Sequence, residues 1–337
     1  MNKFYKIMFL QTLLIGTLIA ISSYSWLMMW IGLEINLLSM IPLMKTSKNL
    51  FPSEAALKYF ITQALASSIL LFSIIISLNF NEHTQSYMNF YSIMIMNSSL
   101  LTKMGAAPFH FWFPEVMEGL SWMNSMMMLT WQKIAPFILI MYNSKMTMFI
   151  ACIIIASSII GGIMGLNQTS IRKILAFSSI NHIGWMLSSL LNSQMIWLIY
   201  FIIYSLINLN LIFIFHKFNS YSISQLFNSV NKNKLIKFFF IINFLSLGGL
   251  PPFLGFLPKW LTINNLISNN FMFMSLTLII STLITLFFYL RLTFSSLTIN
   301  QEESNILIMI KQSWSIIIIN FASLSGLIIC TMIFNMI

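Results

Sequence analysis

The sequence is poor in charge and in cysteine. Its 337 residues include no aspartate, seven acidic residues in all and only 7% charged residues, against 58% hydrophobic residues. Such a chain cannot bury its apolar surface in one soluble core, so it belongs to the integral membrane class. Two cysteines, Cys152 and Cys330, lie in separate apolar runs, which excludes a disulfide framework or a cysteine metal motif. We interpret both as packing residues.

Motifs for soluble chemistry are also missing. We find no glycine-rich phosphate loop, nucleophile elbow, metal-ligand spacing or flavin fingerprint. The net charge of +10 would suit nucleic acid in a soluble protein, but most of the basic residues lie at the ends of apolar runs. At those places they anchor and orient membrane spans.

What the sequence does contain is long apolar runs. A membrane helix needs about 20 apolar residues, and on this basis we predict an all-α polytopic protein with eleven spans. The predicted spans are 4–22, 26–44, 54–79, 88–120, 122–143, 146–165, 171–191, 195–216, 236–266, 271–293 and 313–335. The connections are short except for 217–235 and 294–312, which are long enough to carry a surface helix.

The basic residues predict the orientation. With eleven spans, those outside the spans fall on the side of the N-terminus, with the single exception of Lys145. The positive-inside rule makes this the cytoplasmic or matrix side. Three lysines, Lys103, Lys133 and Lys259, fit neither side and are predicted to lie within the membrane.

Two segments resemble each other and would interrupt a membrane helix. Aligning GAAPFHFWFPEV with GLPPFLGFLPKW pairs Gly105 with Gly249, Pro108 with Pro252, Phe109 with Phe253 and Pro114 with Pro258. The two segments lie five spans apart, which predicts inverted repeats of the kind found in transporters, with discontinuous fourth and ninth helices. In this interpretation residues 1–337 form one membrane domain. It comprises a first repeat over 4–143, a second over 146–293 and a C-terminal helix over 313–335.

Buried charges are the candidates for chemistry, because each is unfavourable in a bilayer unless it is paired or hydrated. Glu34 lies near the middle of the second span, and Lys103 is its natural partner. A neighbouring carboxylate stabilises a buried ammonium, so the pair would act as a proton switch; the alternative is a structural ion pair. Pro108 should kink the helix just after Lys103. His110 would lie on nearly the same face if the helix resumes, and it is either a titrating group or a packing residue.

Two more lysines lie beside predicted breaks. Lys133 precedes Pro136, which should free the carbonyl of Gln132. Lys259 occupies the place that Glu115 has in the first copy, and its alternative role is a lysine that snorkels near a helix end.

Other polar residues have weaker claims. Glu115 and Glu118 should lie near the end of their span and contact water or a neighbouring protein. His182, Ser205 and Asn208 either extend a polar path or serve as contacts between helices.

Several motifs carry a resemblance to a known family. They are WIGLEINLLSMIP, EAALKYFITQALAS, LLTKMGAAPFHFWFPEVMEGLSW, LTWQKIAPF, SSINHIGWM and LSLGGLPPFLGFLPKW. Together they resemble the chain-two family of NADH–ubiquinone oxidoreductase, a mitochondrially encoded membrane subunit of respiratory complex I. The family is related to Mrp-type cation/proton antiporter subunits with fourteen helices. Animal chain two resembles that fold without three N-terminal helices, which fits the eleven predicted spans.

The resemblance implies a function and its residues. Glu34, Lys103, Lys133 and Lys259, with His110 beside them, would form the central axis of a proton channel. It implies a location in the mitochondrial inner membrane, with the N-terminus in the matrix and the C-terminus in the intermembrane space. Partners would be other membrane-arm subunits, including antiporter-like ones, accessory subunits and lipids, with no nucleic acid. FMN, iron–sulfur clusters and ubiquinone would be handled by other subunits, so this chain would carry no cofactor.

Two other functions remain open from the residues alone. The chain could be a free-standing cation/proton antiporter, which would exchange ions when purified by itself. It could also be a structural membrane subunit whose buried charges pair helices during assembly.

Overall fold

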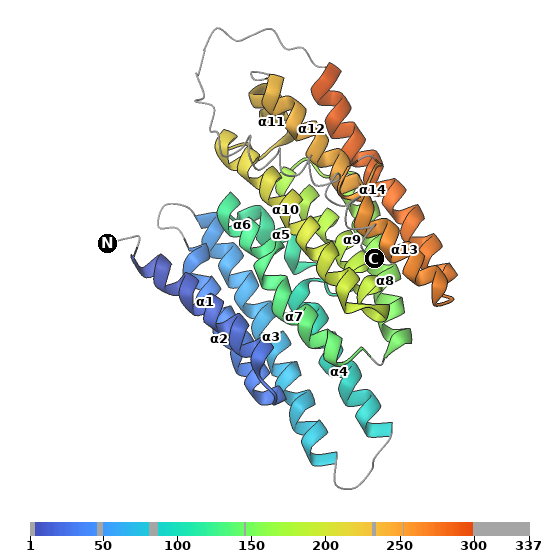
Figure 1. Ribbon diagram of the computed structural model, residues 1–337. Helices are drawn as coiled ribbons and strands as arrows, with labels where there is room; N and C mark the ends of the chain where they lie inside the picture. Colours follow the sequence, from blue (N-terminus) through green and yellow to red (C-terminus); the bar gives the residue numbers. More distant parts are fainter. Residues whose placement is uncertain are drawn as a thin grey trace. The chain divides into compact units, whose positions relative to one another are not determined.

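The structure is all-α. It is a computed structural model that describes residues 4–45, 50–80, 87–144, 146–230, 234–251 and 253–298. Within these ranges the regular elements are helices (Figure 1), and the only β-type pairing is an isolated bridge between Ser170 and Ser222. The predicted fold class is therefore confirmed. The predicted C-terminal span 313–335, Cys330 and Pro252 lie outside the described residues.

Seven of the described helices are long and apolar enough to cross a membrane. They are α1 (Phe4–Ser22), α2 (Trp26–Met44), α3 (Leu50–Phe80), α8 (Thr147–Gly165), α9 (Ile171–Asn192), α10 (Gln194–Phe218) and α14 (Met272–Thr298). Each coincides with a predicted span, although α3 begins four residues earlier than predicted. The connection 217–235 carries the short helix α11 (Ile223–Val230), as its length allowed.

Three predicted spans are each divided into two helices. The span 88–120 consists of α4 (Tyr87–Met104) and α5 (Trp112–Gly119), and the span 236–266 consists of α12 (Lys234–Gly248) and α13 (Phe256–Ser268). These two breaks were predicted. The span 122–143 consists of α6 (Trp122–Leu129) and α7 (Trp131–Tyr142), and this division was not predicted.

The unpredicted break falls at Thr130. Its hydroxyl donates to the carbonyl of Met126 at 2.8 Å, and its backbone, at φ −115° and ψ −71°, departs from regular helical values. Pro136 lies inside α7, so the kink and the freed carbonyl of Gln132 stay predictions, and the break in this span precedes Lys133 rather than following it. The lysine and the break are still neighbours, but a threonine marks the break.

The chain divides into two compact units, Met1–Ser157 and Ser158–Ile337, and the boundary falls within α8. Cys152, on α8, is exposed, so its interpretation as a packing residue was wrong. Its side chain faces outward from the helix. The inverted relation between the two sequence repeats stays a prediction.

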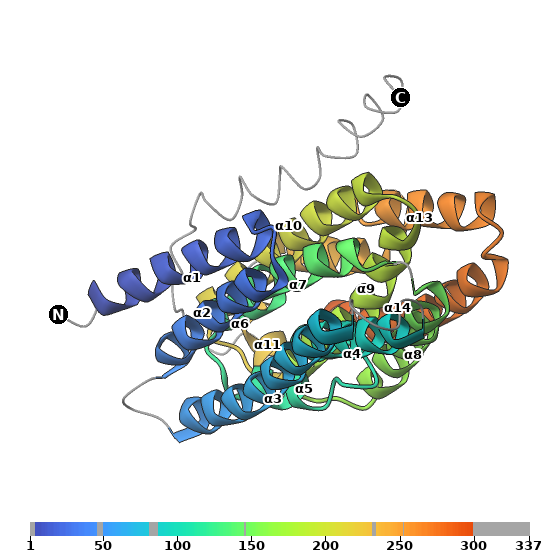
Figure 2. The same ribbon diagram turned by 90° about the horizontal axis from the view of Figure 1, so that it is seen from below.

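In the first unit, α3 is the central helix for the first break. It packs against α2 and against both halves of the divided span, α4 and α5, while α1 packs along α2 (Figures 1 and 2). In the second unit α9 has this central place. It is buried along almost its whole length and packs against α10, α13 and α14.

A glycine, rather than a proline, ends the helix at the first break. Gly105 has φ +75°, its N–H donates to the carbonyl of Thr102 at 3.2 Å, and the N–H of Ala106 donates to the carbonyl of Leu101 at 3.1 Å. This is a Schellman motif, which requires a left-handed residue at its turn and therefore favours glycine. The prediction that Pro108 kinks the helix was wrong, because α4 has already ended at Met104.

The second break repeats this geometry at the offset of the sequence match. Gly249 has φ +74° and donates to the carbonyl of Ser246 at 3.0 Å, while Leu250 donates to the carbonyl of Leu245 at 3.3 Å. Helices α12 and α13 end and begin at the positions that match the end of α4 and the start of α5. The sequence repeat is therefore a repeat of local backbone structure.

Candidate functional site

Lys103 lies in the last turn of α4, and its side chain is buried, with 7% of its surface exposed. It lines a small cavity of about 10 Å³, which is close to the room that one water molecule needs. The other lining residues are Leu33, Asn36 and Leu37 of α2, Tyr59 and Gln63 of α3, and Gln132 and Pro136 of α7. The cavity thus gathers polar groups from three other helices around the lysine.

Two side-chain amides of this cavity have atoms without a hydrogen bond within the described part of the chain. They are Asn36 Oδ1 and Gln132 Nε2, both buried. Gln63 instead donates to the main-chain carbonyl of Lys103 at 3.4 Å. Lys103 Nζ has no hydrogen-bond partner among the residues that the structure describes. The ammonium group therefore faces a small, partly polar cavity rather than a fixed ligand.

Glu34 on α2 is half-buried and interacts electrostatically with both Lys103 and Tyr59. Among the described residues no ion pair within 4.0 Å joins its carboxylate to the Lys103 ammonium, whereas Lys58 pairs with Glu54 and Glu115. The two predicted partners are thus in the same electrostatic environment without direct contact. The interaction energy of such a pair still depends on its separation, and it rises as the two charges approach each other.

Lys133 is almost completely buried on α7, with 1% of its surface exposed. Its Nζ lies 5.5 Å from the centre of the Phe113 ring, within the range of a cation–π interaction. The neighbouring Gln132 reaches the Lys103 cavity, whereas Lys133 does not line it. The two lysines of the first unit therefore lie in different surroundings.

His110 is buried and lies in the turn between α4 and α5. The helix does not resume before His110, so His110 does not share a helical face with Lys103. Its Nδ1 is 3.3 Å from the carbonyl of Pro108 and its ring packs on Phe111. His110 does not line the Lys103 cavity.

Lys259 belongs to the second unit and binds the end of the helix before its break. Its Nζ donates to the carbonyl of Gly248 at 2.9 Å and to that of Leu247 at 3.3 Å, and it lies 5.8 Å from the Trp185 ring. With 7% of its surface exposed, Lys259 is buried and points at main-chain carbonyls, so it does not snorkel out of this unit.

The other polar residues differ in their surroundings. His182 Nδ1 is 2.9 Å from the hydroxyl of Tyr200, and both line a second cavity of about 10 Å³. Ser205 bonds to the carbonyl of Ile202 in its own helix, and Asn208 is buried. Glu115 is exposed and pairs with Lys58 of the same chain, rather than contacting only water or a neighbouring protein.

The sequence reasoning did not identify the polar residues that line the cavity with Lys103. Asn36, Tyr59, Gln63 and Gln132 all lie within apolar helices. Their polarity in these helices was the available signal, because buried amides in membrane helices usually contact another helix or line a cavity.

Comparison with known proteins agrees with this architecture. Residues 23–285 match the family model described as NADH:quinone oxidoreductase/Mrp antiporter, TM. NADH-ubiquinone oxidoreductase chain 2 of Anopheles gambiae is 51% identical over 99% of both chains, and the same-named protein of Aedes aegypti is also 51% identical over 99% of both.

The chain belongs to the NADH-ubiquinone oxidoreductase chain 2 family. The two relatives are by name chains of an oxidoreductase, and the family model that matches this chain describes an antiporter-like membrane domain. A chain in the structure of respiratory complex I from Thermus thermophilus with bound aureothin has the same fold. The TM-score is 0.84 at 22% identity, over 97% of this chain and 79% of that one.

Proposed function

We propose that this chain is a proton-conducting core subunit of respiratory complex I in the inner mitochondrial membrane. Its family membership supports the assignment to the complex. The observation that carries the proton-conducting role is the small, partly polar cavity that contains Lys103 and lies within the electrostatic influence of Glu34. Such a site can hold a proton inside the membrane and respond to movement of either helix.

The proposed path uses the buried ionisable residues in named roles. Lys103 is the proton-carrying group of the first unit, and Glu34 is the charge that modulates it. Lys133, Lys259 and His110 are the further members of the axis. A change in the separation between Glu34 and Lys103 alters the free energy of the charged lysine, which couples helix movement to proton uptake and release.

The remaining parts of the assembly follow from the family. We place the N-terminus in the matrix and the C-terminus in the intermembrane space. Neighbouring membrane-arm subunits, including other antiporter-like chains, accessory subunits and lipids would surround the chain. NADH oxidation, FMN, iron–sulfur clusters and ubiquinone reduction belong to other subunits, which supply the energy for the movement.

The test is proton pumping per electron in assembled complex carrying Glu34→Gln or Lys103→Met. We expect Lys103→Met to abolish the contribution of this subunit, and Glu34→Gln to reduce it, because the lysine then loses its nearby negative charge. Lys45→Met is the matched control. Lys45 is exposed at the end of α2, so this substitution also removes one lysine charge, but away from the cavity. Unchanged pumping in both test variants, with normal assembly, would exclude the proposal.

Two other functions give different results in related measurements. The match to a family model that includes Mrp antiporters supports a cation/proton antiporter as a second candidate. That function predicts cation-dependent proton exchange by the purified chain in vesicles. A purely structural subunit predicts that the double variant Glu34→Leu, Lys103→Leu assembles and still pumps.

A further inference from the structure

One face of α3 contacts both halves of the first divided helix. The contacting residues are Phe51, Ala55, Lys58, Tyr59 and Gln63. Their spacing of four, three, one and four residues places them along one side of a helix. A single rigid element therefore holds the segments before and after the break.

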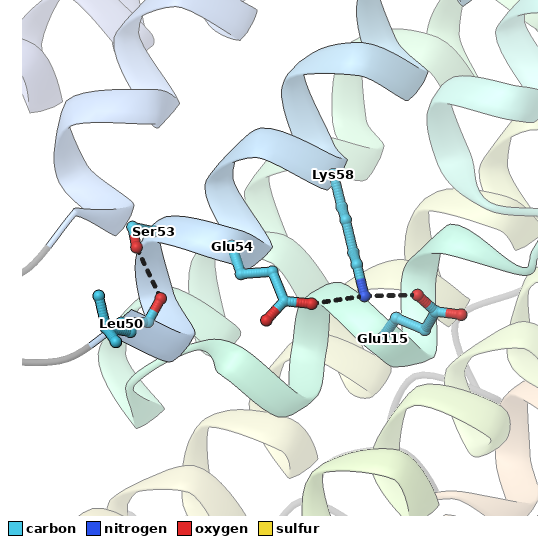
Figure 3. A network of polar contacts seen from close by, with 5 residues as sticks. All are labelled: Leu50, Ser53, Glu54, Lys58 and Glu115. Carbon is cyan, nitrogen blue, oxygen red and sulfur yellow. Dashed lines mark hydrogen bonds and ion pairs between the residues drawn. The ribbon is translucent and has the colours of Figure 1, made fainter.

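The first part of this face holds α5. Lys58 Nζ lies 3.0 Å from Glu54 Oε1 on its own helix and 2.9 Å from Glu115 Oε2 on α5 (Figure 3). At the other end of α5, Gly119 is packed so closely that a Cβ there would lie 2.6 Å from the Cβ of Ala55. An ion pair and a close packing contact thus fix α5 at two points.

The second part of the face leads to Lys103. Tyr59 packs against Trp112 of α5, with ring centres 6.0 Å apart, and Trp112 Nε1 donates to the carbonyl of Thr102 at 3.0 Å. Gln63 donates to the carbonyl of Lys103 itself. A shift of α5 is therefore transmitted to the last turn of α4, from which the Lys103 side chain extends.

Helix α5 depends on these contacts because it is short. It has only eight residues, and an isolated helix of that length is not stable in water. Glu115 lies in its first turn, where a carboxylate interacts favourably with the helix dipole. The candidate span in α3 has 29 residues, or about 44 Å at 1.5 Å per residue, and so exceeds the hydrocarbon thickness of about 30 Å. Its first turns, with Lys58, can therefore reach the membrane surface.

We propose that this face of α3 is a clamp, and that Lys58 and Gln63 are positioning residues for Lys103. The inference rests on the proposed function, because it takes Lys103 as the proton-carrying group. Lys58 fixes α5 through Glu115, α5 fixes the end of α4 through Trp112, and Gln63 holds the main chain of Lys103 directly. The clamp sets where the lysine lies in its cavity relative to Glu34.

The test uses assembled complex carrying Lys58→Met, with pumping per electron measured across a range of pH. We expect a loss of about twofold, in keeping with the modest strength of exposed ion pairs, and a displaced pH profile. Gln63→Leu should move the pH profile of pumping in the same direction as Lys58→Met does. Glu54→Gln is the matched control, because it removes the partner on α3 but keeps the link from Lys58 to α5, and its profile should stay at the wild-type position.

A charge exchange covers the case in which Lys58→Met fails to assemble. The double variant Lys58→Glu, Glu115→Lys restores the link between α3 and α5 with the charges reversed, so it should recover assembly and the pH profile in part. The recovery is partial because the glutamate introduced at position 58 faces Glu54 and the lysine introduced at position 115 lies in the first turn of α5. Either single reversal should be worse than the double variant. This rescue separates positioning through the ion pair from a general need for charge at the membrane surface.

Two results would overturn the clamp. One is a wild-type pH profile in an assembled Lys58→Met complex, and the other is a double reversal no better than the single ones. If Lys103→Met abolishes pumping while Lys58→Met has no effect, only the clamp is excluded. If Lys103→Met has no effect either, the proposed function itself fails.

Discussion

The two helix breaks share one backbone geometry but differ in what binds the end of the preceding helix. At the first break the carbonyl of Lys103 accepts a hydrogen bond from Gln63, a neutral side chain of another helix. At the second break the matching carbonyl, that of Leu247, accepts from Lys259, which also binds the carbonyl of Gly248. The end of the preceding helix is therefore bound by a neutral amide in the first copy and by a buried lysine in the second.

This difference separates two roles for a buried lysine. The C-terminal end of a helix carries partial negative charge, so Lys259 stabilises α12 while the helix end stabilises the ammonium. At the first break Gln63, and not Lys103, binds the end of the helix. The Lys103 ammonium instead faces a cavity and interacts electrostatically with Glu34. The first lysine has room to change its surroundings, and the second is held by its own break.

The largest effect should come from Gly249→Ala. An alanine at φ +74° is strained by roughly 1–2 kcal/mol, and its Cβ would lie 2.7 Å from Lys259 Cδ and 2.9 Å from Nζ. The end of the Lys259 side chain then has to shift, which disturbs its hydrogen bonds to the carbonyls of Leu247 and Gly248. We expect a severe loss of assembled complex, measured on native gels, and loss of pumping in what remains.

Gly248→Ala is the control for this prediction. The added Cβ would meet nothing closer than Tyr289 at 3.6 Å, and Gly248 has no positive φ. Assembly should therefore stay near the wild-type level. Equal losses in the two variants would show that the contact with Lys259 is not the cause.

Comparing Lys259→Met with Gln63→Leu tests the difference between the breaks directly. Lys259→Met leaves two buried carbonyls without their donor, and each lost partner costs about 1–3 kcal/mol. Gln63→Leu removes one long bond of 3.4 Å. Lys259→Met should therefore lower the unfolding temperature of the complex in detergent more than Gln63→Leu does, as measured by thermal unfolding. The reverse order would contradict the assignment of Lys259 as the binding group of α12.

The smallest of these effects should come from Gly105→Ala. Its φ of +75° imposes the same backbone strain, about 1–2 kcal/mol, but the new Cβ would approach Phe113 at 3.1 Å rather than a lysine. A shift of a few tenths of an ångström in Phe113 relieves that contact. We expect a moderate loss of assembly, smaller than for Gly249→Ala in the same native-gel measurement.

Much of the fold was predictable because it depends on local sequence. Run length and scarcity of charge predicted the membrane helices, and the two matching glycine- and proline-containing segments predicted the breaks in 88–120 and 236–266. The proline at 108 was wrongly given the decisive role, since a left-handed glycine ends the helix before the proline is reached. The break at Thr130 was missed because no glycine or proline lies beside it in the sequence.

By itself the sequence determined the class of protein, the positions of the two matched breaks and the identity of the buried ionisable residues. Only the tertiary structure decided which groups surround each of them: the amides of Gln63 and Gln132 near Lys103, the carbonyls that bind Lys259, and the link from Lys58 to Glu115. The physical reason is that helix formation follows from residues a few positions apart. Contacts between helices depend on how each helix is rotated and placed against its neighbours, and that follows from the packing of the whole unit.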